Sequence, residues 1–300
     1  MTTTGDYIKI HFIVFLWGFS AILGKLISIP LVEMIFYRAL LATAGMALVL
    51  LFSRAVFRIG MADSLKLILT GLIIAMHWIA FYGAARIANV SVSLIGFATV
   101  SLFTAFLEPL SLGRKINLLE VALGCVVILG VTVIFSADFV HGVGFFVGIL
   151  SALTAAVFSI INSKMIRRIH AYSIMFYEMA GATLGLLLFL PIYKISWAEE
   201  GMLNLYPARA DWFYIGLLAM VCTVYAYTGM IALMKRVSVF LIQLTVNMEP
   251  VYGILMAVVI FGEKEKMSLN FYLGALMILS AVIFYPVFRR KFQKQVASNS

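Results

Sequence analysis

Val90-Ser-Val-Ser-Leu-Ile95 recurs as Val237-Ser-Val-Phe-Leu-Ile242, and this repetition decides the fold. Each copy opens an apolar run, which a short basic turn connects to a second apolar run containing glycine. The second runs also match, with Gly124-Cys-Val-Val-Ile-Leu129 corresponding to Gly274-Ala-Leu-Met-Ile-Leu279. Because polar and glycine positions recur in the same order, at an offset that drifts only from 147 to 150 residues, the pattern indicates an internal repeat rather than shared composition.

The composition excludes a water-soluble protein. Of the 300 residues, 64% are apolar and 12% are charged, about half the charged fraction of a soluble domain, and the mean hydropathy is +1.08. The net charge of +9 comes from short basic clusters between long apolar runs, which indicates membrane orientation and no nucleic-acid partner. Cys125 and Cys222 lie in apolar runs without metal-ligand spacing, so we expect no metal and no cofactor.

Ten apolar runs are long enough to cross a bilayer, which needs about 20 residues per helix. They cover residues 8–27, 32–52, 65–85, 90–112, 118–136, 143–163, 172–193, 212–234, 239–261 and 271–288. The runs lack the two-residue alternation of an outer-membrane barrel, so they must be helical. The sequence therefore predicts an all-α integral membrane protein of ten transmembrane helices, with five-helix repeats at 1–137 and 138–290 and a basic cytoplasmic tail at 291–300.

The repeat unit contains an odd number of spans, so the second copy enters the membrane upside down. Two inverted halves are related by a pseudo-two-fold axis in the membrane plane, and a substrate site lies at their interface near the midplane. With the N-terminus inside, 15 Lys and Arg residues fall on the cytoplasmic side and 6 on the opposite side. This asymmetry predicts cytoplasmic termini, and we expect a location in a bacterial inner membrane.

Several motifs resemble the EamA-type exporters of the drug/metabolite transporter superfamily over nearly the whole chain. They are Trp17-Gly18-Phe19-Ser20, Tyr37-Arg38-Ala39, the Val90-Ser-Val-Ser opening, Phe261-Gly262-Glu263 and the glycine-containing closing runs. The resemblance implies a central cavity lined by spans 1, 3, 4, 6, 8 and 9, with spans 5 and 10 outside, but it does not specify the substrate. The chain departs from the family at Gly113-Arg114, where members commonly have Gly-Glu.

Glu249 is the strongest candidate for a functional residue, because ionisable groups inside a span are costly. It lies in Asn247-Met-Glu-Pro250, where proline frees a backbone carbonyl. A mid-membrane carboxyl beside a broken helix can bind substrate or carry a proton, so Glu249 is the proton-coupling candidate. The alternative is a neutral, hydrogen-bonded packing residue. Glu108 is interpreted as an interfacial partner of Arg114 and Lys115.

Other polar and aromatic side chains complete the predicted substrate site. Arg38 either reaches the interface beside Glu33 or binds a substrate carboxylate through its planar fork. Mid-span aromatic and amide groups either line the cavity or pack and join helices. The predicted substrate-binding residues are Trp17, Ser20, Arg38, His77, Trp78, Phe81, Tyr82, Tyr225, Gln243, Asn247 and Glu249.

The main hypothesis is a secondary transporter that exports small amphipathic metabolites such as amino acids. No nucleotide-binding loop and no common hydrolase motif occurs, so an enzyme is not expected and a gradient must supply the energy. Two alternatives from other classes are a flippase-like carrier of lipids or lipid precursors and an intramembrane enzyme, and a channel is a third. Expected partners are a small-molecule substrate and the lipid bilayer, and the expected oligomeric state is a monomer or homodimer.

Overall fold

The computed structural model describes residues 2–53, 58–88, 90–135, 142–198, 201–249, 251–253, 255–256 and 269–298, and these contain helices and turns but no strand. The first half comprises α1 (Thr4–Leu26), α2 (Leu31–Phe52), α3 (Met61–Ile87), α4 (Val90–Ala98), α5 (Val100–Ser111) and α6 (Leu118–Phe135). The second comprises α7 (Gly142–Met165), α8 (Ala171–Ser196), α9 (Arg209–Ala219), η3 (Met220–Tyr225), α10 (Ala226–Leu233), α11 (Val239–Val246) and α13 (Leu269–Ser298). The all-α prediction is therefore confirmed for the described chain.

Six helical runs among the described residues are long and apolar enough to cross a membrane. They are Thr4–Gly24, Leu31–Phe52, Met61–Ile87, Gly142–Met165, Ala171–Ser196 and Arg209–Leu233, with shorter apolar helices at Leu118–Val133 and Tyr272–Tyr285. Large apolar side chains cover their outer faces, and Phe52 and Ile195 are 90% and 85% exposed. Such surfaces are costly in water and suit contact with lipid chains.

Three predicted spans contain irregular turns, and in the ninth α11 ends at Val246 before a turn at residues 247–248. The fourth is divided between α4 and α5 at Thr99, whose hydroxyl donates to the Gly96 carbonyl at 2.7 Å and competes with the helical pattern. The eighth is one continuous helix from Arg209 to Leu233 with the wider π turn η3 in its middle. The tenth predicted span continues as α13 through Ser298, beyond its expected end at 288. The described residues do not include Ser136, Pro250, Phe261-Gly262-Glu263 or the Lys25 side chain.

Glycines allow two close helix crossings between the halves. The α3 backbone at Gly71 lies against the Glu178 carbonyl of α8, where a Cβ on Gly71 would also come within 2.8 Å of Ala182 N. Gly96 of α4 faces Gly148 of α7, and a Cβ there would lie 2.7 Å from the opposite Cα. Gly148 belongs to a Gly144-xxx-Gly148 motif in α7, and α8 carries Gly181-xxx-Gly185, so small residues spaced by one helical turn permit both crossings.

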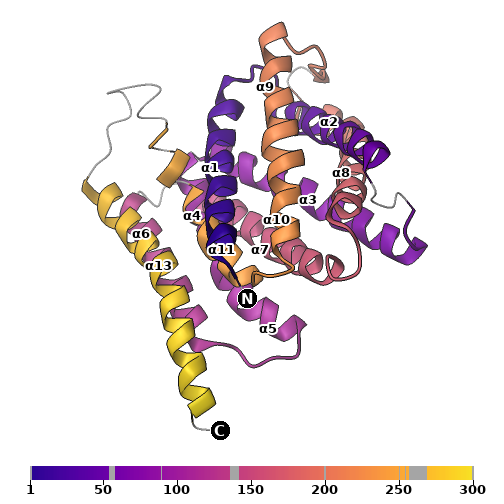
Figure 1. Ribbon diagram of the computed structural model, residues 1–300. Helices are drawn as coiled ribbons and strands as arrows, with labels where there is room; N and C mark the ends of the chain where they lie inside the picture. The colour runs from indigo at the N-terminus through magenta and orange to yellow at the C-terminus, as the bar shows by residue number, and fades with distance from the viewer. Residues whose placement is uncertain are drawn as a thin grey trace.

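The helices of the two halves interleave around a common centre. In the first half, α3 packs on α7 and α8, α2 on α8 and α9, and α1 on α9, α10 and α11. The pair α6 and α13 lies beside this bundle as a separate layer (Figure 1). The start of α1 and the end of α13 point toward the same end of the molecule in that view.

Polar contacts join the halves near both ends of the bundle. At the start of α9, Asp211 accepts from Ser28 N at 2.9 Å and from Ser28 Oγ at 2.6 Å. At the other end, Arg236 forms a 2.8 Å ion pair with Asp6, which lies in the capping box that begins α1. Glu108 lies near the same end as Arg236, because it binds the start of α11 just beyond that arginine.

Candidate functional site

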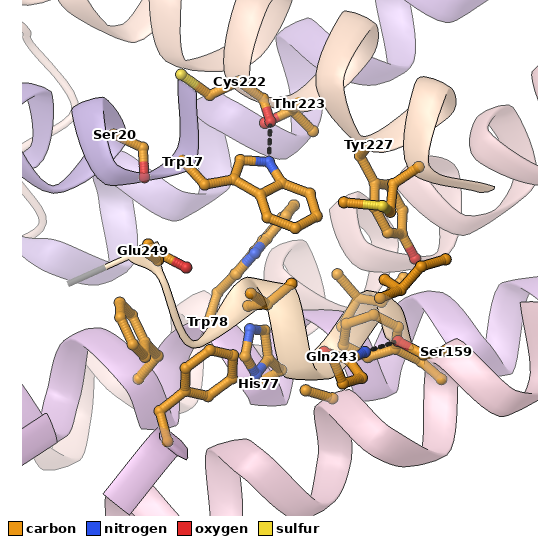
Figure 2. Close-up of a pocket in the computed structure, with 18 of the residues that line it drawn as sticks. Trp17, Ser20, His77, Trp78, Ser159, Cys222, Thr223, Tyr227, Gln243 and Glu249 are labelled. Atoms are coloured by element: carbon orange, nitrogen blue, oxygen red, sulfur yellow. Dashed lines mark hydrogen bonds between the residues drawn. The ribbon is translucent and has the colours of Figure 1, made fainter. Parts of the chain in front are cut away.

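A cavity of about 90 Å³ lies between the two halves, with room for several water molecules or part of a small solute. Nine of the eleven predicted site residues line it, namely Trp17, Ser20, Arg38, His77, Trp78, Phe81, Tyr82, Gln243 and Glu249. They come from α1, α2 and α3 of the first half and from α11 and the segment after it in the second. Figure 2 shows Trp17, Trp78, His77 and Glu249 around this shared space.

Arg38 is the cation of the cavity wall and is only 5% exposed. Its Nε donates to Thr223 Oγ1 at 2.8 Å, and its Nη1 donates to the Tyr82 hydroxyl at 3.1 Å. The guanidinium carbon lies 4.3 Å from the centre of the Trp78 ring, which is a cation–π contact. Glu33, the alternative partner, instead accepts from Asn204 N at 3.2 Å. The cavity therefore holds a positive charge whose orientation is set by three neighbours.

The π turn η3 provides a backbone hydrogen-bond acceptor at the cavity wall. Trp17 Nε1 on α1 donates to the Cys222 carbonyl at 2.9 Å (Figure 2). The Cys222 thiol lies 3.3 Å from the Leu16 carbonyl, so two contacts join α1 to this turn. Thr223, in the same turn, is the residue that holds Arg38. Single π turns occur often at functional sites, and this one places two cavity groups that a regular α-helix would orient differently.

His77 has its polar contact on the side of α7. Its Nδ1 lies 2.9 Å from both the carbonyl and the hydroxyl oxygen of Ser151, and the partner that it uses depends on its tautomer. Aromatic rings surround the imidazole, with Phe97 at 5.5 Å and Phe158 at 5.4 Å between ring centres. His77 therefore belongs to an aromatic part of the cavity lining, together with Phe97 and Phe158.

The α11 side supplies an amide and a carboxyl group. Gln243 Nε2 donates to Ser159 Oγ on α7 at 2.6 Å, so the amide also joins two helices (Figure 2). Glu249 is 8% exposed and lines the cavity, and the described residues give its carboxyl no hydrogen bond. Its backbone carbonyl lies beside Gly18, where α1 crosses at close range. Glu249 thus has polar capacity directed at whatever occupies the cavity.

Two predicted site residues do not line the cavity. Tyr225 is 53% exposed and packs edge-on against Phe12, because the π turn rotates it away from the centre. Asn247 is buried, with neither amide atom in a hydrogen bond, but it lies outside the cavity lining. Sequence reasoning missed other lining residues, which are Ile74, Phe97, Ala155, Phe158, Ser159, Cys222, Thr223, Tyr227, Met230, Met234, Ile242 and Val246.

One carboxyl group differs from its sequence interpretation. Glu108 was expected to pair with Arg114 and Lys115, but its oxygens accept from Val239 N at 3.2 Å and Phe240 N at 2.9 Å. It therefore caps α11 from the other half of the chain, because helix N-termini carry unpaired N–H groups. A second carboxyl group, Glu178 of α8, is fully buried. No cluster suited to a metal ion occurs among the described residues.

The comparison with known families agrees with this architecture. The EamA-like transporter family matches residues 7–136 and 142–285. The chain belongs to the EamA-like transporter family. It is therefore a multi-pass integral membrane protein of the drug/metabolite transporter superfamily, and its family consists of transporters.

Structural comparison also identifies a similar fold. This chain is similar to a protein of known crystal structure, with 16% sequence identity and a TM-score of 0.75. The match covers 94% of this chain and 96% of that protein's chain. At this identity the likeness establishes the fold alone. No curated protein matches the sequence.

Proposed function

We propose that this EamA-like transporter is a secondary active exporter of small zwitterionic or amphipathic metabolites such as amino acids. The observation that carries the proposal is a single cavity between the two halves whose lining includes both Arg38 and Glu249. Opposite charges within an aromatic wall match a molecule that carries an ammonium, a carboxylate and an apolar side chain. The outward direction rests on the resemblance to EamA-type exporters.

The contacts between the halves support alternating access by ten spans in two inverted repeats. If α7 corresponds to α1, α8 to α2, α9 with α10 to α3, and α11 to α4 with α5, each contact has a counterpart. The packing of α3 on α7 then corresponds to that of α1 on α9 and α10, and α3 on α8 corresponds to α2 on α9. The pair α6 and α13 corresponds to itself. Such two-fold pairing is the pattern expected when one half rocks against the other.

The buried position of Arg38 favours a small solute over a lipid as the substrate. A flippase-like carrier needs a groove that opens sideways to lipid, with basic residues at its mouth. Arg38 instead lies 5% exposed among Thr223, Tyr82 and Trp78. Binding a hydrated headgroup there would require the loss of these contacts.

Proton coupling through Glu249 completes the proposal. The Glu249 carboxyl and the Arg38 guanidinium belong to side chains that line the same cavity. A substrate carboxylate at Arg38 changes the electrostatic field there, so substrate and proton can influence each other. The proposal includes a bacterial inner membrane with both termini on the cytoplasmic side, which the uneven distribution of Lys and Arg between the loops supports.

A ligand screen followed by transport tests this function. Purified protein is heated with single amino acids, nucleosides and cationic drugs, because a ligand at 100 times its Kd stabilises by about 2.7 kcal/mol. A stabilising amino acid is then used as the labelled substrate in proteoliposomes, with and without a pH gradient. We expect Glu249→Gln to lose gradient-driven transport, while Glu108→Gln, which changes a carboxyl outside the cavity, keeps it. Stabilisation by drugs or nucleosides alone would contradict the substrate class, and an unchanged Glu249→Gln would contradict the coupling role.

A further inference from the structure

A second buried carboxyl group lies behind one wall of the cavity. Glu178 on α8 is 0% exposed, and its Oε2 accepts from the Tyr227 hydroxyl at 3.1 Å and from Asn162 Nδ2 at 3.3 Å. Asn162 Nδ2 also donates to the Tyr227 hydroxyl oxygen at 2.8 Å. The three side chains come from α8, α7 and α10, so the cluster forms only in the folded chain.

The neighbouring helices provide no cation for Glu178 within the described part of the chain. The facing group on α10 is Tyr227 and that on α7 is the neutral Asn162. On α3 the backbone at Gly71 packs against the Glu178 backbone, and the titratable His77 of that helix contacts Ser151 of α7. On α2 a side-chain hydrogen bond to α8 joins the hydroxyls of Thr43 and Thr183. An ionised carboxylate without a cation in such a place is costly, so the neutral acid is favoured.

The cluster has unused hydrogen-bonding capacity. Glu178 Oε1 and Asn162 Oδ1 are both buried without a hydrogen-bond partner. Buried polar atoms of this kind are rare in stable cores, where each orphaned group costs about 1–3 kcal/mol. A residue kept only for packing would be better served by an apolar side chain of similar size. The cluster therefore has the features of a group that changes its protonation state.

Tyr227 connects this carboxyl to the cavity. Its side chain lines the cavity, and its ring packs edge-on against Phe158 of the aromatic wall. It lies in the first turn of α10, directly after the π turn that holds Trp17 and Arg38. A proton gained or lost at Glu178 therefore changes a hydrogen bond on the same helix that positions the cavity cation.

We propose that Glu178 is a second proton-binding site, distinct from Glu249, that exchanges its proton with the cavity through the Tyr227 hydroxyl. The proposal rests on the proposed transport function and extends it. When the proton is on Oε2, the carboxyl donates and the tyrosine oxygen accepts. The tyrosine then passes its own proton to a water molecule in the cavity. The net change is the conversion of a carboxylic acid and water into a carboxylate and hydronium, with the tyrosine restored.

Infrared spectroscopy of the purified protein in lipid nanodiscs tests this without a substrate. A protonated carboxyl has a C=O stretching band that a carboxylate lacks, and Glu178→Gln should remove one such band. The same band should remain in Glu249→Gln and disappear as the wild type is taken to alkaline pH. In Tyr227→Phe the band should shift, because the Glu178 carboxyl loses its hydrogen bond to the tyrosine. After a pH jump, the change in the band should be about tenfold slower, or smaller, than in the wild type.

The outcomes separate this proposal from the transport function. If no band is lost in Glu178→Gln, the group is ionised and the proposal is wrong. A band that stays constant at every pH would identify a permanently neutral packing residue and would also overturn it. Should Glu178→Gln fail to fold, the shift and slowed response in Tyr227→Phe decide the question. Because none of these signals requires transport, a failed transport assay leaves the infrared result intact, and a failed infrared test leaves Glu249 as the coupling group.

Discussion

A matched pair of glycine substitutions in α3 measures how much the close crossing with α8 contributes to stability. A Cβ on Gly71 would lie 2.8 Å from Ala182 N and closer still to the Glu178 carbonyl, so rigid backbone would have to move. A Cβ on Gly83, in the same helix, would meet nothing within 4 Å. Both Gly→Ala changes gain about 1 kcal/mol of helix propensity, so the difference between the variants isolates the overlap.

The expected difference is about 3 kcal/mol, the upper end of overpacking costs, because the atoms that must shift are backbone rather than flexible side chain. Gly83→Ala should be at least as stable as the wild type, and Gly71→Ala should be less stable than both. Reversible unfolding of each variant by SDS in mixed micelles measures the apparent free energies. If Gly71→Ala is as stable as Gly83→Ala, α3 and α8 are further apart than the structure has them. The positions of His77 and Trp78 on α3 would then also be in error.

Three further substitutions test individual contacts. Trp17→Phe removes the donor to the Cys222 carbonyl and should lower thermal stability by about 1 kcal/mol in the ligand-free protein, whereas no change would mean that the bond is not formed. Glu108→Gln replaces a carboxylate that accepts two N–H groups at the start of α11 and should cost about 1 kcal/mol, with an equal stability arguing against this inter-half cap. Asp63→Asn breaks the exposed 2.6 Å pair with Arg168 and should cost less than about 0.5 kcal/mol, an effect that added salt removes, and a larger loss would point to a buried role for Asp63.

The sequence predicted only part of the candidate site. Ionisable and aromatic residues within apolar runs identified Arg38, His77, Trp78 and Glu249, because such side chains are conspicuous where lipid excludes water. Thr223 carries no comparable signal, since hydroxyl groups are common in membrane helices. Tyr225 lies outside the cavity lining, 53% exposed at the end of η3, and no local pattern in the sequence indicates this π turn.

The apolar runs alone determined that this protein is helical and membrane-embedded, because a bilayer leaves the backbone no other way to satisfy its hydrogen bonds over that length. The tertiary structure decided which helices cross closely. It also decided which carbonyl accepts from Trp17 and which helix Glu108 caps. Each of these contacts joins residues far apart in the chain. Their distances depend on helix rotation and crossing, which side-chain packing sets and which no local pattern encodes.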